Sequence, residues 1–302
     1  MKATADLKIS AAEQARQIEE FIRSVKDTVE NDGLLIGLSG GLDSAVAAFM
    51  AVRAVGANQV HLLNLVERDS NPAHQRDAQF IADELDIDLM SEDITTLLKQ
   101  MGAYRLLPIS RLPTRRLRAG LVDVGRRLLG LSEADKILQA RLHPKKNSFI
   151  SRGNAYAMAK HRLRMIVLYQ HAEINNWLVV GAANRTEWLT GTFSKWGCDH
   201  CADLMPLLHL YRTQIEQLAV YVGVPARIRE KTADPDVLPG INDKEALLGS
   251  FSMTDQILMQ IESGASQDEI AVDYNIERVD KIFELHHLSE PLRKIPYHLS
   301  MG

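Results

Sequence analysis

One stretch near the N-terminus decides the fold, GLLIGLSGGLDSAVAAFMAV, residues 33–52. It begins after a turn signal, Asn31-Asp32-Gly33, with an apolar run from Leu34 to Leu38 that predicts a buried strand. A glycine-rich turn follows, and Ser44 then opens an apolar segment that predicts a buried helix. The stretch therefore predicts a strand, a tight turn and a helix, the repeating unit of an α/β protein.

The same unit recurs along the chain. Further strands are expected at residues 60–66, 87–90 and 177–180, and helices at 8–30, 72–85 and 154–175. This alternation predicts a doubly wound, Rossmann-like α/β fold with helices on both faces of a parallel sheet. Ligands of such sheets bind outside the carboxyl ends of the strands. We therefore expect a site formed by the residues after Leu38 and after Val180.

Two segments fall outside this alternation in an otherwise single domain, residues 1–302. Residues 105–150 form a basic insertion, expected to be helical, and residues 250–302 form a helical C-terminal extension with breaks at Gly264 and Asn275. The cations of the insertion include Arg111, Arg115, Arg116, Arg118, Arg126, Arg127, Arg141, Lys145 and Lys146. Such a segment can contact RNA, a partner or phosphate groups, but we favour an amphipathic flap whose arginines face solvent.

The composition argues against several classes of protein. A net charge of -4 and a pI near 6.2 disfavour a nucleic-acid or membrane-surface binder, because such proteins usually have a basic excess. Residues 1–14 lack the apolar core of a signal peptide, and no run of about 18 apolar residues is present to span a bilayer. The cysteines, Cys198 and Cys201, are too few for a secreted disulfide framework. We expect a soluble cytoplasmic protein.

The turn after the first strand, residues 37–44, is suited to binding phosphate. Its glycines let successive backbone N–H groups face one point, and the following helix adds its positive N-terminus. The turn is not a Walker A loop, which needs a lysine after the glycine. It also fits the G-x-S-x-G pattern of serine hydrolases, with Ser39 as the nucleophile. A third interpretation is a glycine turn that only lets the helix pack on the strand.

The string S-G-G-x-D-S at residues 39–44 is more specific than these patterns. It resembles the phosphate loop of the N-type ATP-pyrophosphatases, within the adenine nucleotide alpha hydrolase-like superfamily. Further blocks, over most of the chain outside the insertion, resemble the ammonia-dependent NAD synthetases in particular. They follow that family's order at residues 67–72, 77–78, 92–95, 162–165, 181–195, 202–203, 206–207, 210–214, 218–219, 223–225, 231–232 and 239–240.

The resemblance implies an activity and its partners. The implied reaction is deamido-NAD + ATP + NH₃ to NAD + AMP + diphosphate, in which ATP activates a carboxylate as an acyl-adenylate. The ammonia is expected to be free or to come from a separate donor, because the chain has no cysteine outside 198–201 to act as an amidotransferase nucleophile. The resemblance also implies a homodimer.

The same resemblance assigns roles to individual residues. ATP is expected to bind to Gly37, Ser39, Gly40, Gly41, Asp43, Ser44 and Arg164. Catalysis is assigned to Asp43, Lys195 and Arg164, the two cations neutralising charge on the α-phosphate. Mg²⁺, which prefers hard oxygen ligands, is assigned to Asp43 and Glu187. The substrate is assigned to Asp199, Asp203, Lys231 and Thr232.

Three positions depart from the family's pattern. Ala182 replaces a threonine, Met158 stands where an asparagine is expected, and C-D-H-C at residues 198–201 lengthens a turn. The last can be a redox pair or a metal site built from Cys198, His200 and Cys201. A structural zinc needs four ligands, however, and no second cysteine pair completes the set. We favour two reduced thiols that line a binding loop.

These departures keep three alternatives open. The first is a related ATP-pyrophosphatase that amidates or thiolates another substrate. The second is a serine hydrolase that uses Ser39, and the third is a nucleotide-binding paralogue without catalysis. Turnover of ATP with deamido-NAD separates the expected ligase from all three.

Overall fold

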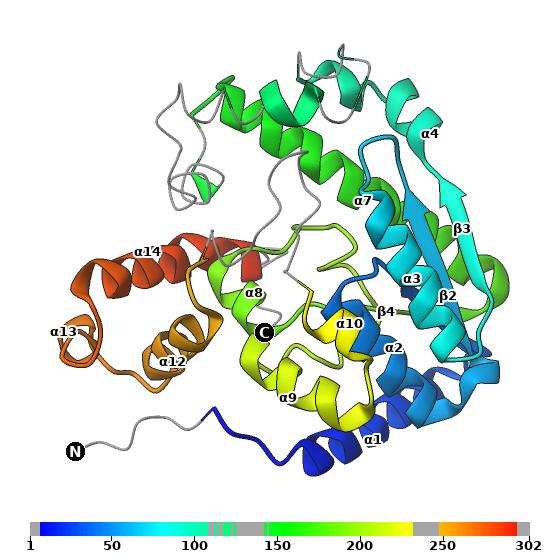
Figure 1. The fold of residues 1–302 in the computed structure, drawn as a ribbon, viewed down its shortest axis with the longest axis horizontal. Coiled ribbons are helices and arrows are strands. Elements are labelled where there is room, and N and C mark those ends of the chain that lie inside the picture. The colour runs from blue at the N-terminus through cyan, green and yellow to red at the C-terminus, as the bar shows by residue number, and fades with distance from the viewer. Residues whose placement is uncertain are drawn as a thin grey trace, which may run out of the picture.

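The computed structural model describes residues 7–107, 112, 114, 117–121, 124, 142–143, 145–231 and 248–294. Its centre is a parallel sheet of four strands in the order β3-β2-β1-β4 (Figure 1). The strands are β1 (Gly33–Gly37), β2 (Val60–Val66), β3 (Leu89–Asp93) and β4 (Trp177–Val180). The first strand of the sequence therefore lies inside the sheet, between β2 and β4, as a buried apolar run predicts.

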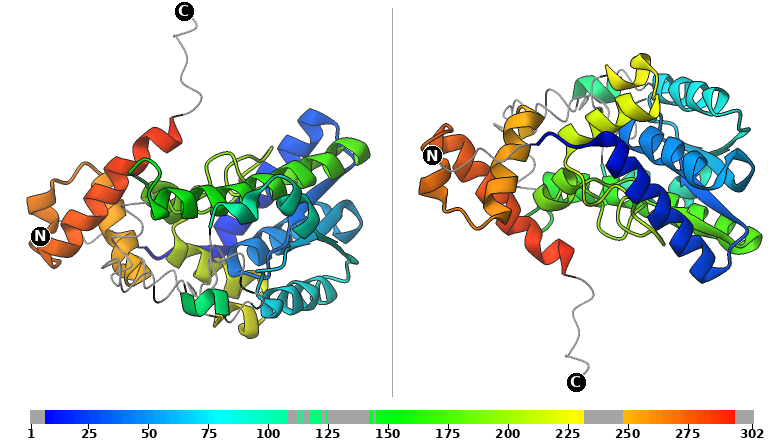
Figure 2. Two further views of the ribbon diagram at one scale, coloured as in Figure 1. Left: turned by 90° about the horizontal axis from the view of Figure 1, so that it is seen from above. Right: turned by 90° about the horizontal axis from the view of Figure 1, so that it is seen from below.

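Helices cover both faces of the sheet, which confirms the doubly wound fold. Leu34 and Ile36 point to a core shared with α1 (Ala11–Val29), α2 (Leu42–Val55), α3 (Pro72–Glu84), α9 (Arg212–Val222) and α10 (Ala226–Arg229). Leu35, between them, points to the opposite core, with α4 (Thr95–Gln100) and α7 (Phe149–Asn175). Figure 2 shows α7 and α2 on opposite sides of the strands. Short 3₁₀ turns, Ala57–Gln59 and Ala103–Arg105, complete the connections.

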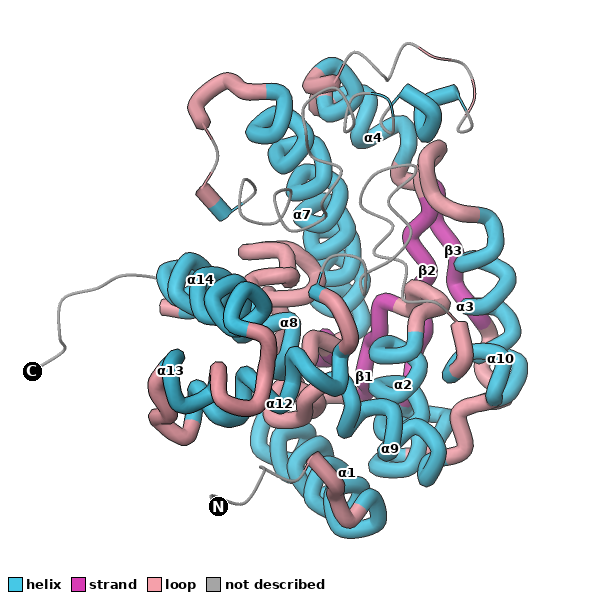
Figure 3. Tube along the Cα trace, turned by 60° about the vertical axis from the view of Figure 1, so that its left-hand side comes forward, coloured by secondary structure: helices cyan, strands magenta, loops and turns pink. Residues whose placement is uncertain are grey.

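A third core joins the C-terminal helices to the rest of the chain. It contains residues of α12 (Phe251–Glu262), α13 (Gln267–Ile270) and α14 (Ile276–Arg293), together with Leu189 of α8 (Arg185–Thr190). Gly264 and Asn275 lie at the two breaks, as the sequence predicts, and the Asn275 side chain caps α14. The C-terminal helices stand beside α8, away from the strands (Figure 3).

Two elements differ from the sequence-based boundaries for physical reasons. Helix α7 begins at Phe149 because the Ser148 side chain accepts the Ser151 N–H at 3.1 Å, which caps it well before residue 154. Strand β3 runs to Asp93 although Ser91, Glu92 and Asp93 are polar, because it is an edge strand and those side chains are exposed.

Most of the basic insertion lies outside the described residues, and of its arginines only Arg105 and Arg118 are described. Arg118 is described, and only 5% of it is exposed, so this arginine does not face solvent as the sequence suggested. Among the helices that the structure describes, none is both long and apolar enough to cross a membrane.

Candidate active site

A cavity of about 240 Å³ lies at the carboxyl ends of β1, β2 and β4. The sheet order brings these three strand ends together, so the loops after Leu38 and after Val180 meet in one wall. The opposite side is formed by the start of α3 and the middle of α7. The expected site residues in the wall are Gly37, Ser39, Gly41, Asp43, Ser44, Arg164, Glu187, Asp199 and Lys231.

The loop between β1 and α2 is held in shape by its own hydroxyls. Ser39 Oγ lies 3.0 Å from Ser44 Oγ and accepts the Gly41 N–H at 3.2 Å. The first backbone bond inside the helix runs from Ala45 N to Gly41 O at 3.1 Å, so the N–H groups before Ala45 stand at the helix terminus beside the cavity. Glycine at 41 and the helix N-terminus together form a site for an anion. The Ser39 hydroxyl is therefore directed into its own loop.

Gly40 makes the close packing of this loop possible. Its φ is 78°, and a Cβ placed there would be 2.2 Å from the carbonyl oxygen of His74 in α3. Only glycine therefore allows the loop to lie against the start of α3.

A strained backbone conformation alone costs roughly 1–3 kcal/mol. We expect Gly40→Ala to lower the free energy of unfolding by more than this, because the clash with His74 is added to the strain. Gly102→Ala is the matched control, since Gly102 has a φ of 79° and a Cβ there would meet nothing within 4 Å. Urea unfolding of both variants gives the comparison. Equal losses would show that the close approach at Gly40 has no energetic consequence.

Asp43 and Glu187 approach the same cavity from the first turns of α2 and α8 and share Asn184 as a partner. Asp43 Oδ1 accepts from Asn184 Nδ2 at 2.9 Å, while Glu187 Oε2 accepts the Asn184 N–H at 3.3 Å. The Asn184 side chain in turn accepts the Glu187 N–H, which completes a capping box at the start of α8. The cap fixes Glu187 beside Asp43, although 144 positions separate the two in the sequence.

Arg212 is the cation that faces these carboxylates. Its Nη1 lies 2.7 Å from Asp43 Oδ2, and its Nε lies 3.2 Å from Glu216 Oε1. Burial lowers the pKa of Arg212, but the charges of Asp43 and Glu216 outweigh that effect and raise it. Arg212 lies in one of the blocks that resemble the family, but the sequence analysis did not assign it to the site. Only the folded chain places it against Asp43.

The C-terminal helices fix the position of α8. Asp255 of α12 is fully buried and accepts from Thr186 Oγ1 at 2.5 Å and from the Thr213 N–H at 2.9 Å. Arg185 makes a paired contact with Glu262, at 2.6 and 2.5 Å. The extension thus carries no cavity-lining group of its own among the described residues, but it anchors the helix that presents Glu187.

Three cations in the wall, Arg164, Arg212 and Lys231, make the cavity suitable for a polyanion. Arg164 is oriented by a bond from its Nε to the Leu65 carbonyl oxygen at 3.2 Å. Lys231 bonds to the Gly40 carbonyl oxygen at 3.2 Å and to Asp77 at 2.7 Å. Although burial raises the pKa of Asp77, its bonds from Lys231 and Arg227 hold it below the usual value, so Asp77 stays anionic.

Three expected site residues, Gly40, Lys195 and Asp203, do not line the cavity. Lys195 follows Ser194, which lines the cavity, but its own side chain is not part of the lining. Asp203 accepts from Val179 N at 2.7 Å and from Tyr169 Oη at 3.1 Å, so both its oxygens have protein partners beside β4. Thr232 lies outside the described residues.

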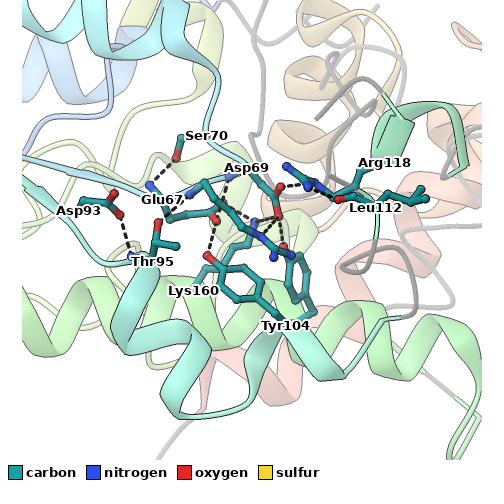
Figure 4. A network of polar contacts seen from close by, with 11 residues as sticks. Glu67, Asp69, Ser70, Asp93, Thr95, Tyr104, Leu112, Arg118 and Lys160 are labelled. Atoms are coloured by element: carbon teal, nitrogen blue, oxygen red, sulfur yellow. Dashed lines mark hydrogen bonds and ion pairs between the residues drawn. The ribbon is translucent and has the colours of Figure 1, made fainter. Parts of the chain in front are cut away.

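A buried ionic network supports the loop after β2 (Figure 4). Glu67 accepts from Lys160 Nζ at 2.6 Å and from Tyr104 Oη at 2.7 Å. Asp69 lies 2.6 Å from Arg118 Nε and also accepts from Tyr156 Oη. Both carboxylates are 1% exposed at the side chain, so the network holds the loop, α7 and the described part of the insertion together.

The positions that depart from the family's pattern gather in the cavity. Ala182, Met158 and Cys198 all line it. Burial, and then the charge of Asp199, raise the pKa of the Cys198 thiol, so it is neutral in the absence of another ligand. His200 instead stacks on Trp188 and Phe193, with ring centroids 5.3 and 5.2 Å apart, outside the wall.

Asn64 is a further cavity residue that sequence reasoning missed. Its Nδ2 donates to the Leu38 carbonyl oxygen at 2.6 Å, while its buried Oδ1 has no hydrogen-bond partner among the described residues. The sequence did contain a signal for this residue, because Asn64 is a polar residue that interrupts the apolar run of the buried strand β2. Its Oδ1 is therefore an unused acceptor in the cavity wall among the described residues.

These features define a class of protein: a doubly wound α/β protein with a cavity at the carboxyl ends of its strands, whose glycine-rich turn and three cations suit a polyanion. The chain matches the family model of NAD synthase over residues 14–106 and 122–296, and it belongs to that family.

Relatives of known activity are similar over nearly the whole chain. An NH₃-dependent NAD⁺ synthetase of Thermotoga maritima is 37% identical over 281 residues, covering 91% of this chain and 96% of the relative. An enzyme of the same name from Coprothermobacter proteolyticus is 34% identical over 295 residues, covering 96% and 98%.

Solved structures share the fold at lower identity. An NMN synthetase from Francisella tularensis superposes with a TM-score of 0.70 at 22% identity, covering 97% of this chain and all of the other. An NH₃-dependent NAD synthetase from Campylobacter jejuni gives 0.69 at 19% identity, with the same coverage. At these identities the likeness shows the fold alone.

Proposed function

We propose that this chain is a ligase that forms a carbon–nitrogen bond: deamido-NAD + ATP + NH₃ to NAD + AMP + diphosphate. The observation that carries the proposal is the cavity itself, in which the S-G-G-x-D-S loop, Asp43, Glu187 and three cations meet. Relatives at 34–37% identity over more than nine-tenths of the chain, named NH₃-dependent NAD⁺ synthetases, support the choice of reaction.

The residues of the cavity have distinct tasks in this proposal. The N-terminus of α2, with Ser39, Gly40, Gly41 and Ser44, binds the ATP phosphates, because it presents N–H and hydroxyl donors to an anion. The substrate carboxylate attacks the α-phosphorus, the bond to the diphosphate breaks, and an acyl-adenylate forms. Ammonia then attacks the acyl carbon, loses a proton, and AMP leaves. Arg164 neutralises charge that develops on the α-phosphate, and Lys195, next to the lining residue Ser194, shares this task by resemblance.

The carboxylates fit Mg²⁺, which when bound would neutralise phosphate charge. Asp43 and Glu187 offer hard oxygen ligands in one wall, and Mg²⁺ in nucleotide sites takes one or two carboxylates with phosphate oxygens. A carboxylate has about four acceptor positions, and Asp43 uses one with Asn184 and one with Arg212. It therefore keeps acceptor capacity for a cation.

The remaining assignments are part of the same proposal. Asp199 and Lys231, in the cavity wall, bind the dinucleotide, and Asp203 and Thr232 belong to this set by resemblance. The active form is a homodimer in the cytoplasm that uses free ammonia or ammonia from a separate donor. Size-exclusion chromatography with light scattering tests the dimer.

The proposal is tested with purified chain, ATP, Mg²⁺ and ammonium, with and without deamido-NAD. We expect NAD to form and diphosphate to be released only when deamido-NAD is present. A fluorophosphonate probe serves as the control for the hydrolase alternative, and we expect it to leave Ser39 unlabelled. ATP binding without turnover on any carboxylate would instead identify a paralogue without catalysis.

A further inference from the structure

A histidine, a cysteine and an aspartate meet in the cavity wall opposite the phosphate loop. His161 comes from α7, whereas Cys198 and Asp199 come from the turn after α8. His161 Nδ1 lies 3.5 Å from Cys198 Sγ and 3.6 Å from Asp199 Oδ2, and Cys198 Sγ lies 3.5 Å from Asp199 Oδ1. One ligand atom from each residue thus falls within 4.8 Å of the other two.

The backbone holds this turn directly on α7. A Cβ at Gly197 would lie 2.8 Å from the Cβ of His161, so glycine is what permits the close approach. The Cys198 N–H bonds to the His161 carbonyl oxygen at 3.3 Å, and the Cys201 N–H closes the turn on Gly197 O at 2.8 Å. Cys198 and His161 are therefore neighbours through main-chain contacts as well as through their side chains.

The separations fit the edges of a metal tetrahedron. Zinc binds sulfur at about 2.3 Å and nitrogen or oxygen at about 2.0–2.2 Å, and tetrahedral angles then separate the ligand atoms by about 3.3–3.6 Å. From His161 Nδ1, the separations are 3.5 Å to Cys198 Sγ and 3.6 Å to Asp199 Oδ2, while Cys198 Sγ lies 3.5 Å from the other carboxylate oxygen, Asp199 Oδ1.

We propose that His161, Cys198 and Asp199 bind Zn²⁺, with the fourth position open to the cavity. Nitrogen, thiolate and carboxylate are all zinc ligands, and three protein ligands with an open position are typical of zinc sites that contact a substrate or water. A thiolate and a carboxylate balance the charge of the ion. The bound site therefore adds no net charge beside Arg164, the cation of the same wall.

This site differs from the one that the C-D-H-C string suggests. His200 lies on the other side of the turn, where its Nδ1 accepts the Trp196 N–H at 3.3 Å and its ring stacks on Trp188. Cys201 is not among the three residues whose ligand atoms converge. The third ligand instead comes from α7, 37 positions before Cys198, so a search for neighbouring ligands in the sequence could not find it.

The test is the zinc content of the purified full-length chain after loading with excess Zn²⁺ and removal of unbound metal. We expect about one equivalent in the wild type and in Cys201→Ser, and less than about a tenth in Cys198→Ser. Cys201→Ser is the matched control, because it makes the same chemical change in the same turn. Replacement of Zn²⁺ by Co²⁺ is expected to give thiolate charge-transfer absorption that Cys198→Ser abolishes.

His161→Asn is a second variant that tests whether the loss of zinc in Cys198→Ser comes from misfolding. Circular dichroism identifies the folded variants, and we expect folded His161→Asn to lose zinc as Cys198→Ser does. A wild-type chain that retains no zinc above the buffer blank would overturn the proposal. So would equal zinc in the wild type, Cys198→Ser and His161→Asn, which would place the ion elsewhere. Neither result depends on the proposed ligase activity.

Discussion

Asp43→Asn lowers the rate of NAD formation by at least about 100-fold in the folded enzyme, because it removes a charge fixed beside the phosphate loop. Asparagine has nearly the same shape, so it preserves the packing at the start of α2. It cannot offer Mg²⁺ a charged oxygen, and it leaves the buried Arg212 without its partner at 2.7 Å. The measurement is a steady-state assay at saturating ATP with a Mg²⁺ titration. We expect Glu187→Gln to behave in the same way.

Glu216→Gln is the matched control for Asp43→Asn. Glu216 is the other carboxylate of Arg212, at 3.2 Å, but its side chain is 47% exposed and does not line the cavity. We expect its activity to stay within about threefold of the wild type, since an exposed ion pair contributes about 1 kcal/mol at most. Equal losses in the two variants would mean that the orientation of Arg212, and not the carboxylate at the cavity, determines the rate.

Lys160→Met lowers the free energy of unfolding by about 3–5 kcal/mol, the usual result of removing one partner from a buried ion pair. The Lys160 side chain is 2% exposed, and its Nζ lies 2.6 Å from Glu67 and 4.0 Å from Asp69. Burial lowers the pKa of Lys160, while both carboxylates oppose that shift. Methionine leaves two buried carboxylates with less positive charge beside them. Urea unfolding measures the loss.

Lys294→Met tests whether this effect comes from burial. Lys294 pairs with Glu290 one turn away on α14, but its side chain is 67% exposed. We expect a change of about 0.5 kcal/mol or less in that variant. The double variant Lys160→Met with Glu67→Gln is expected to recover part of the loss, because it removes one unpaired charge. A Lys160→Met loss no larger than that of Lys294→Met would contradict a stabilising network.

The sheet and the phosphate loop could be predicted because their signals are local. Strands 60–66 and 177–180 coincide with the observed β2 and β4, since buried parallel strands are continuous apolar runs. The third strand was predicted at residues 87–90, whereas β3 spans Leu89–Asp93. The difference arises because the second half of β3 is polar, and no local pattern indicates an edge strand whose side chains face solvent.

The site could be predicted only in part, for a related reason. The family resemblance indicated Asp43 and Glu187, and their places after the adjacent strands β1 and β4 supported it, because strand ends are where ligands bind. Arg212, Asn64 and His161 are different. Arg212 meets Asp43 across 169 positions, and His161 meets Cys198 across 37, and such contacts depend on how helices pack on the sheet. No periodicity or short pattern encodes that packing.

Formation of NAD from deamido-NAD tests the central claim most directly. The purified chain is given ATP, Mg²⁺, ammonium and an equal mixture of deamido-NAD and the acid form of NMN, and both amides are measured with the released diphosphate. We predict NAD as the main amide, about one diphosphate for each NAD, and AMP instead of ADP as the other product. Amidation of the mononucleotide alone, or no diphosphate release by folded chain that binds ATP, would contradict the account.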